Sequence, residues 1–252
     1  MKKLSILLLV MFFIITISCN SEENDVNPGI VNINFNNKVG NEILNLQQGN
    51  YNKNGNETFS VDELKYIISN IVLIDAKGNE FVYPQENSYF LINEEVSTTK
   101  RIALQDINAN EYTSIRFGIG VDQSRFPLNG VENFVPTAEE NNMIWSWSAG
   151  YIFMRLEGLY SSTQVTNTPF KYHIGSHGQN LDNYREVSLN FMQPLAVSSS
   201  ENAEIDINFD VLKLFSGEHN MLLQNKDDVQ IDPENAPKIR DNYTNAFEIG
   251  LN

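Results

Sequence analysis

Cysteine, tryptophan and histidine are scarce: the 252-residue sequence has one cysteine, two tryptophans and three histidines. Because Cys19 is the only thiol, it cannot form an intramolecular disulfide or a site with several thiolates. The G-x-S-x-G pattern of a hydrolase nucleophile is missing. Ser176 and His177 are adjacent, but the sequence shows no third group that would complete a catalytic triad with them. Carboxylates are too numerous for any pair of them to indicate acid–base catalysis. We therefore expect no enzymatic activity.

Basic residues are also few, with 17 Lys and Arg against 32 Asp and Glu and a formal net charge of −15. A negative field of this kind repels the phosphates of nucleic acids and anionic lipid headgroups. A nucleic-acid partner is therefore not expected. The charge is compatible with attracting cations or a basic partner protein, although acidity also simply keeps a protein soluble.

A long apolar run occurs near the start of the chain, at residues 4–15, after Lys2 and Lys3. It is short for a membrane span, and a small residue precedes Cys19. Residues 1–18 therefore resemble a bacterial lipoprotein signal peptide that is cut before Cys19. Lipid on Cys19 would attach the protein to the outer membrane, on its periplasmic face or at the cell surface.

Residues 19–29 are polar and acidic and end in Pro28-Gly29. This composition predicts a flexible tether between the lipid and the folded domain. The acidic run also resembles the surface-export signals of Bacteroidetes lipoproteins. A solvated linker with no sorting role is the alternative.

The remaining residues, 30–252, predict one β-rich domain, because apolar and polar residues alternate in short segments. Half-buried strands are expected at residues 31–35, 112–121, 187–191 and 205–211, with a hairpin partner at 80–83. Residues 64–75 are apolar on both faces and typical of a central strand, with a helix starting near Ser60 as the alternative. Long loops are expected at 122–142 and 225–243. We predict an all-β fold, a single antiparallel β-sandwich or barrel-like domain, with one short helix at 211–215.

The segment Met143–Phe153 contains both tryptophans. At period two, Trp145 and Trp147 fall on the same face, which predicts a β-strand with one buried side. An intact indole donates a hydrogen bond but cannot ligate a metal. The simplest interpretation is therefore that the two rings pack in a sandwich core.

Two of the three histidines, His173 and His177, are separated by only three residues. A turn at Gly175 would aim both rings at one site, and neutral imidazole is a common ligand that suits copper. His219 and Met143 are further candidates for accessory contacts, although methionines in cores mostly serve packing.

These landmarks form an ordered pattern along the chain. The first is M-x-W-x-W-x-x-G-Y, and the second is aromatic-x-x-His-x-Gly; their residues are Met143, Trp145, Trp147, Gly150 and Tyr151, then Phe170, His173 and Gly175. With the segments 66–70 and 112–120, the pattern resembles the MbnP-like family. These are bacterial copper-binding proteins from the methanobactin and metallo-mystery pair gene neighbourhoods.

The resemblance implies a secreted β-rich domain that binds copper through histidine nitrogens, here His173 and His177. It also implies that a partner diheme peroxidase oxidises a tryptophan, Trp145 or Trp147, to kynurenine, which is a possible ligand. Tyr151 would be an accessory residue beside Met143 and His219. Two features depart from the family: a four-cysteine motif of one branch is missing, and some relatives have a histidine where this chain has Ser146 and Trp147.

The alternative function is a surface lipoprotein that binds glycan or a protein partner through exposed aromatic residues. Exposure of the two tryptophans on a flat face would favour glycan binding. Burial of a tryptophan beside His173 would favour copper.

Overall fold

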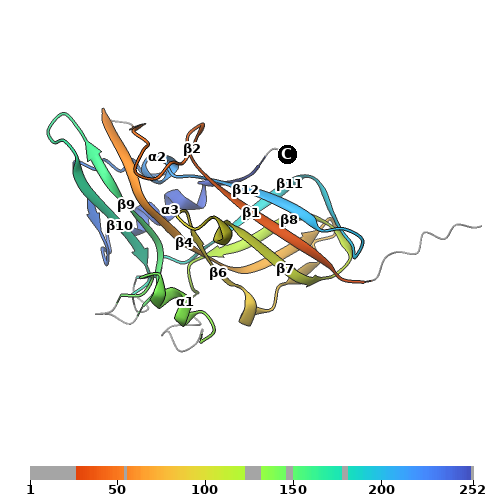
Figure 1. The fold of residues 1–252 in the computed structure, drawn as a ribbon. Helices are drawn as coiled ribbons and strands as arrows, with labels where there is room; N and C mark the ends of the chain where they lie inside the picture. Colours follow the sequence, from red (N-terminus) through yellow and green to blue (C-terminus); the bar gives the residue numbers. More distant parts are fainter. Residues whose placement is uncertain (1–26, 54–55, 123–131, 146–149, 178–180, 251–252) are drawn as a thin grey trace, which may run out of the picture.

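The computed structural model describes residues 27–53, 56–122, 132–145, 150–177 and 181–250. Within these ranges two β-sheets pack face to face, a smaller one of five strands and a larger one of nine (Figure 1). The expected signal peptide, Cys19, most of the tether and Trp147 lie outside the described residues. In the described part of the chain, no helix is long and apolar enough to cross a membrane.

The smaller sheet has the strand order β14-β12-β1-β2. Strand β7 also pairs with β1. The strands of this sheet are β1 (Gly29–Val39), β2 (Glu42–Ile43), β7 (Arg101–Ile107), β12 (Ala203–Asp210) and β14 (Phe247–Ile249). Strands β1 and β12 are parallel, with Ile33 opposite Ile205. A parallel pair needs a long connection, and here most of the chain lies between the two strands.

The larger sheet has the order β11-β8-β4-β9-β10-β13, and three short strands, β3, β5 and β6, also pair with β4. Its strands are β3 (Tyr51–Lys53), β4 (Glu57–Asp75), β5 (Glu80–Val82), β6 (Tyr89–Asn93), β8 (Asn110–Ile119), β9 (Ile152–Ser161), β10 (Thr168–Gly175), β11 (Arg185–Val197) and β13 (Asp228–Val229). Strand β4 is the central element, as predicted, because its β-branched residues are buried on both faces.

The predicted all-β sandwich is confirmed, and among the described residues neither sheet closes into a barrel. The expectation that all pairing would be antiparallel was wrong at two places, since β1–β12 and β10–β13 are parallel. Residue alternation along a strand carries no information about the direction of its partner, so the sequence could not reveal this.

Among the described residues, two helices occur in segments that were expected to be loops, and a third overlaps the short helix predicted at residues 211–215. They are α1 (Val135–Glu140), α2 (Lys213–Ser216) and α3 (Ala236–Thr244), with 3-10 turns η1 (Gln85–Asn87) and η2 (Ser97–Lys100). Helix α3 begins just after Asp232, whose carboxylate accepts the backbone N–H groups of Glu234 and Asn235. Its buried face includes Ile239 and Tyr243, four residues apart, which is too short a pattern to stand out in a polar segment.

The inner core, between the two sheets, is built from apolar residues of both. The smaller sheet contributes Ile33, Phe35, Ile207, Phe209 and Phe247, and the larger contributes Tyr66, Ile115, Phe117, Met154 and Tyr172. Their rings contact one another edge-on or tilted, as with Phe209 and Phe247, whose centroids are 4.6 Å apart. Burial of this area is the main source of fold stability.

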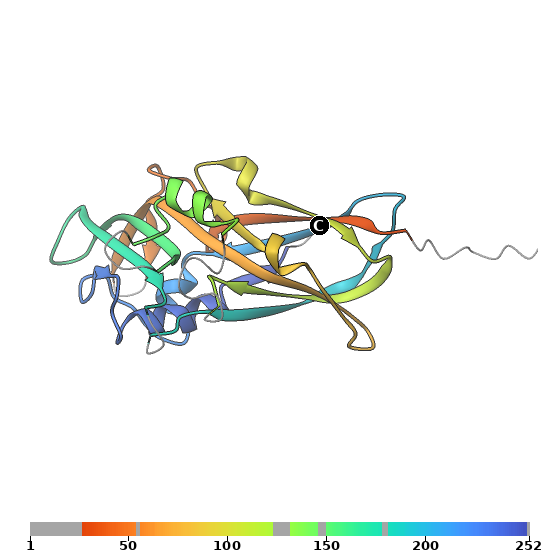
Figure 2. The same ribbon diagram turned by 90° about the horizontal axis from the view of Figure 1, so that it is seen from below.

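A second apolar cluster, the outer layer, covers the opposite face of the larger sheet. It consists of Ile67, Leu91, Val121, Phe134, Ala138, Met143, Trp145, Tyr151, Ile152 and Phe153. Helix α1 supplies Ala138, and Figures 1 and 2 show α1 lying against the sheet that contains β4 and β9. Strand β4 therefore points Tyr66 into the inner core and Ile67 into the outer layer.

Candidate functional site

The segment Met143–Phe153 is not the single strand that the sequence predicts. Ile144 pairs antiparallel with Tyr151, and the N–H of Ile152 donates to the carbonyl of Met143 at 2.8 Å. The chain therefore reverses direction between Ile144 and Tyr151, and β9 begins only at Ile152. Alternation is the same in one strand and in two paired arms, which is why the pattern did not distinguish them.

The predicted burial along this segment is confirmed where it is described. Met143 is completely buried, and Trp145 and Tyr151 are each 4% exposed. All three belong to the outer layer. Trp147 lies outside the described residues, so Trp145 is the tryptophan that the structure places.

Trp145 lies directly against the backbone of β10. A Cβ atom added at Gly175 would lie only 2.7 Å from Cη2 of Trp145 and would also collide with the carbonyl oxygen of Tyr151. Gly175 is therefore required for close approach, and it lies within β10. The expectation of a turn at Gly175 was wrong, because the missing side chain makes room for the indole.

His173 lies two residues before Gly175 on β10 and is 5% exposed. Its neighbours Tyr172 and Ile174 face the inner core, so His173 lies on the other face, the one that Trp145 covers at Gly175. The Nε2 atom of His173 is 2.7 Å from Oε1 of Glu157 on β9. No described residue forms a hydrogen bond with Nδ1.

Glu157 belongs to a chain of alternating charges on this face. Arg155 pairs with Glu157 at 2.8 Å and with Glu63 at 2.7 Å, and Lys65 pairs with Glu63 at 2.6 Å. The hydrogen bond with His173 holds the pKa of Glu157 below its ordinary value, and Arg155 adds to this effect, while partial burial opposes it. Glu157 is therefore an ionised acceptor at neutral pH.

The same charges attach the outer layer to the sheet. Lys65 donates to the carbonyl of Asn141 at 3.3 Å, and Arg155 donates to the carbonyl of Asn142 at 3.2 Å. These carbonyls follow the end of α1, where Asn142 has a φ of 57°. The charged side chains of the network therefore help to hold the segment that begins at Met143 against the larger sheet.

The other two histidines lie elsewhere. His177 is exposed, beyond the end of β10, and its N–H donates to the carbonyl of Leu181 at 2.9 Å. His219 lies near the corner between α2 and α3, with Nε2 3.5 Å from Asp241. In the described part of the chain, no group of three or more His, Cys, Asp or Glu side chains is arranged to hold a metal ion.

The hydroxyl of Tyr151 is buried and has no hydrogen-bond partner among the residues that the structure describes. Burial, with a smaller contribution from Glu139, raises the pKa of Tyr151 to about 12. The phenol is therefore neutral. A buried polar group without a partner is uncommon in native proteins and usually has a specific cause, such as a functional site.

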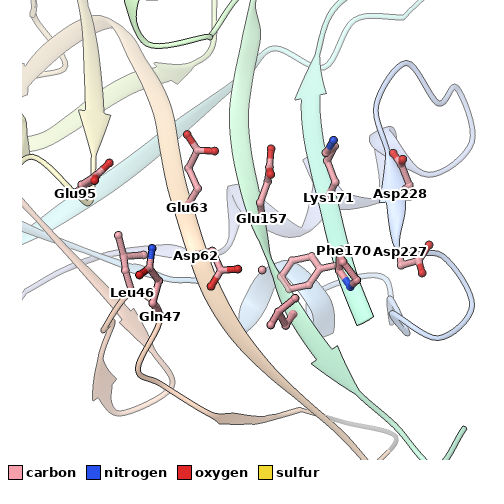
Figure 3. A pocket seen from close by; sticks show the side chains of 13 residues that line it. Leu46, Gln47, Asp62, Glu63, Glu95, Glu157, Phe170, Lys171, Asp227 and Asp228 are labelled. Carbon is pink, nitrogen blue, oxygen red and sulfur yellow. The ribbon is translucent and has the colours of Figure 1, made fainter. Parts of the chain in front are cut away.

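A cavity of about 820 Å³ adjoins the network. Its carboxylates come from β4, β9, β13 and the loops near them: Asp62, Glu63, Glu95, Glu157, Asp227 and Asp228. Figure 3 shows Glu63, Glu157 and Lys171 pointing to the same side from three neighbouring strands. Glu157 therefore both lines an acidic cavity and contacts His173.

Glu157, Arg155 and Glu63 were not singled out in the sequence. The available signal was local: Arg155 and Glu157 interrupt the otherwise apolar run of β9 at period two. Lys171 and His173 do the same on β10. Only the pairing of β9 with β10 and β4 shows that these charges meet.

The molecule is thus a β-sandwich whose larger sheet carries a buried tryptophan and a buried histidine on its outer face. A family model described as MbnP matches residues 28–235, and the chain belongs to the MbnP family. The fold is similar to that of MbnP from Methylosinus trichosporium, with a TM-score of 0.53 and 12% sequence identity, over 78% of this chain and 80% of that chain. No curated protein sequence matches the chain.

Proposed function

We propose that this protein is an extracytoplasmic copper-binding protein of the MbnP type, with a site at His173, Trp145 and His177. The observation that carries the proposal is the contact of Trp145 with Gly175. Gly175 lies midway between His173 and His177 in the sequence, and the indole covers it from the face on which His173 lies. Oxidation of Trp145 would therefore create its new donors on the face of β10 on which His173 lies.

The donor set suits copper more than a hard cation. His173 has an Nδ1 atom without a described hydrogen-bond partner, and imidazole nitrogen is a good ligand for copper. Met143 is buried in the same cluster as Trp145 and offers a thioether, which copper(I) accepts. These groups fit copper provided that Trp145 becomes a donor, because an intact indole is not one.

Conversion of Trp145 to kynurenine would meet that requirement. Cleavage of the indole C2–C3 bond takes up two oxygen atoms from two molecules of hydrogen peroxide, which leave as water, and gives N-formylkynurenine. Hydrolysis then releases formate and leaves an aromatic amine and a ketone. A diheme peroxidase is the proposed partner, and this chain is its substrate and performs no catalysis itself.

The remaining parts of the proposal concern location. Lipid on Cys19 and the tether at residues 19–29 would attach the domain to the outer membrane, on its periplasmic face or at the cell surface. The net charge of −15 is consistent with a protein that attracts cations and does not bind nucleic acid.

The glycan-binding alternative receives less support. Trp145 is 4% exposed and cannot act as a flat surface platform. Within the described residues, the exposed large hydrophobic side chains are aliphatic: Ile43, Val82, Val96 and Met192.

The test is copper(I) titration by calorimetry on protein purified from its native host. We expect one copper ion per chain in wild type and at least tenfold weaker binding in His173→Ala, since one good ligand is lost. His219→Gln is the matched control, because His219 contacts Asp241 near α3. Equal copper uptake by wild type and a His173→Ala, His177→Ala double variant would refute the site.

Native material also tests the modification. Peptide mass analysis of residues 143–155 should reveal an oxidised tryptophan, which protein made alone in a heterologous host should lack. Intact tryptophan in native protein would refute the modification and leave histidine-based copper binding to the titration.

A further inference from the structure

The contact between Glu157 and His173 fixes which ring nitrogen carries the proton. The two atoms, Oε1 and Nε2, are 2.7 Å apart. An ionised carboxylate can only accept a hydrogen bond, so Nε2 must be the donor. In the neutral imidazole the free lone pair is then on Nδ1, and no described residue forms a hydrogen bond with Nδ1.

Glu157 is itself held in place. Its Oε1 atom also accepts Arg155 at 2.8 Å, and Arg155 is held from its other side by Glu63 at 2.7 Å. Lys65 completes the arrangement through Glu63 at 2.6 Å. Each charge is paired with the next, and these ion pairs hold the carboxylate of Glu157 in its orientation toward His173.

Burial protects the hydrogen bond from water. The side chain of His173 is 7% exposed, while that of Glu157 is 26% exposed toward the acidic cavity. A hydrogen bond to an ionised group in such a partly shielded position is stronger than one between neutral groups. The imidazole orientation is therefore set before any ligand arrives.

We infer that Glu157 is the positioning residue of the site: it holds His173 with a proton on Nε2, so that Nδ1 is the nitrogen that binds the metal. This inference rests on the proposed function, in which His173 is a copper ligand. Metal-binding histidines commonly donate their second ring N–H to a carboxylate, which orients the ring and raises its basicity.

The metal-free protein provides the first test. Nitrogen-15 spectra of uniformly labelled protein report the protonated nitrogen of each histidine ring, and His173→Gln assigns the signal. We expect a protected Nε2–H proton on His173 that exchanges slowly with water. Glu157→Ala should lose that protection, and Glu157→Gln should restore much of it because its amide oxygen still accepts. A proton on Nδ1 in wild type, or a protected signal that persists in Glu157→Ala, would overturn the inference.

Copper(I), which is diamagnetic, provides the second test on the same samples. Its addition should perturb Nδ1 of His173 and leave the Nε2–H signal in place. Glu157→Ala should weaken copper affinity by about 10- to 100-fold. The matched control is Glu80→Ala, which breaks the Arg116–Glu80 pair at 2.9 Å elsewhere on the sheet and should leave affinity unchanged.

The copper site and the positioning role of Glu157 can be refuted separately. If copper binds and the Nε2–H signal of His173 disappears, Nε2 is the ligand and the role given to Glu157 is wrong, while the copper site stands. If wild type takes up no copper, the proposed function is wrong, and the spectra of the metal-free protein alone decide whether Glu157 orients the ring.

Discussion

The two faces of the larger sheet are both buried, but by different kinds of neighbour. The inner core is a continuous set of aliphatic and aromatic side chains from both sheets. The outer layer is smaller, lies beside an ion-pair network and a buried histidine, and contains a tyrosine hydroxyl that bonds to no described residue. The inner core is therefore the main source of stability, whereas the outer layer holds polar groups in fixed positions at some cost in stability.

The largest effect is expected from the inner core. Phe209→Ala removes a completely buried ring whose centroid is 4.6 Å from that of Phe247. We expect a loss of about 3–5 kcal/mol in the free energy of unfolding, because a large cavity is created. Chemical denaturation measures this loss. If folded Phe209→Ala protein also shows weaker copper binding, the two faces are not functionally separate.

A smaller effect is expected from the outer layer. Gly175→Ala would place Cβ 2.2 Å from the carbonyl oxygen of Tyr151 and 2.7 Å from Trp145, so both the backbone at Tyr151 and the indole must shift away from β10. We expect a loss of about 1–3 kcal/mol, which is typical of overpacking. Tryptophan fluorescence should move to longer wavelength as the ring becomes exposed.

Gly78→Ala is a control for the Gly175 change, because no atom lies within 4 Å of an added Cβ there, although its φ of 82° adds local strain. It should lower stability without altering tryptophan emission. Unchanged emission in Gly175→Ala would show that Trp145 does not depend on this contact.

The network should contribute a modest pH dependence. The folded-state pKa of Glu157 lies below its ordinary value of 4.5, mainly through the hydrogen bond with His173. The stabilisation is therefore present above about pH 4.5 and is lost as the pH falls through the lowered pKa. Thermal unfolding between pH 6 and pH 3 should show a steeper loss in wild type than in Glu157→Gln, which has no charge to lose. Identical slopes would mean that the network adds nothing to stability.

The smallest effect is expected at Tyr151. Its hydroxyl is buried and no described residue bonds to it, so Tyr151→Phe removes a polar group that gains no hydrogen bond from the described part of the fold. Stability should stay the same or rise by about 1 kcal/mol. A clear loss of stability would mean that the hydroxyl has a partner in solution, and the outer layer would then resemble the inner core more closely.

Much of the fold followed from residue alternation. The strands that became β1, β4, β8 and β12 were predicted because each has a run of inward apolar residues that is long enough to identify. The rings of Tyr184 and Phe153 lie where Cβ atoms of Gly118, in β8, and Gly120, just after it, would be. Helix α3 was missed because its apolar pattern is short.

Only part of the candidate site could be predicted from the sequence. Trp145 and His173 could be chosen from their residue types and from the family resemblance, and they do lie on one face of the larger sheet. Glu157 could not be chosen, since an acidic residue is unremarkable in a chain with 32 of them.

The sequence by itself thus determined the β-rich class, the family and the burial of Met143, Trp145 and Tyr151, because periodicity and residue type are local properties of the chain. Tertiary structure decided where the chain reverses after Met143, which strands are parallel and which carboxylate meets His173. Those features depend on register between strands far apart in sequence, and register is set by packing of the whole sheet rather than by any one segment.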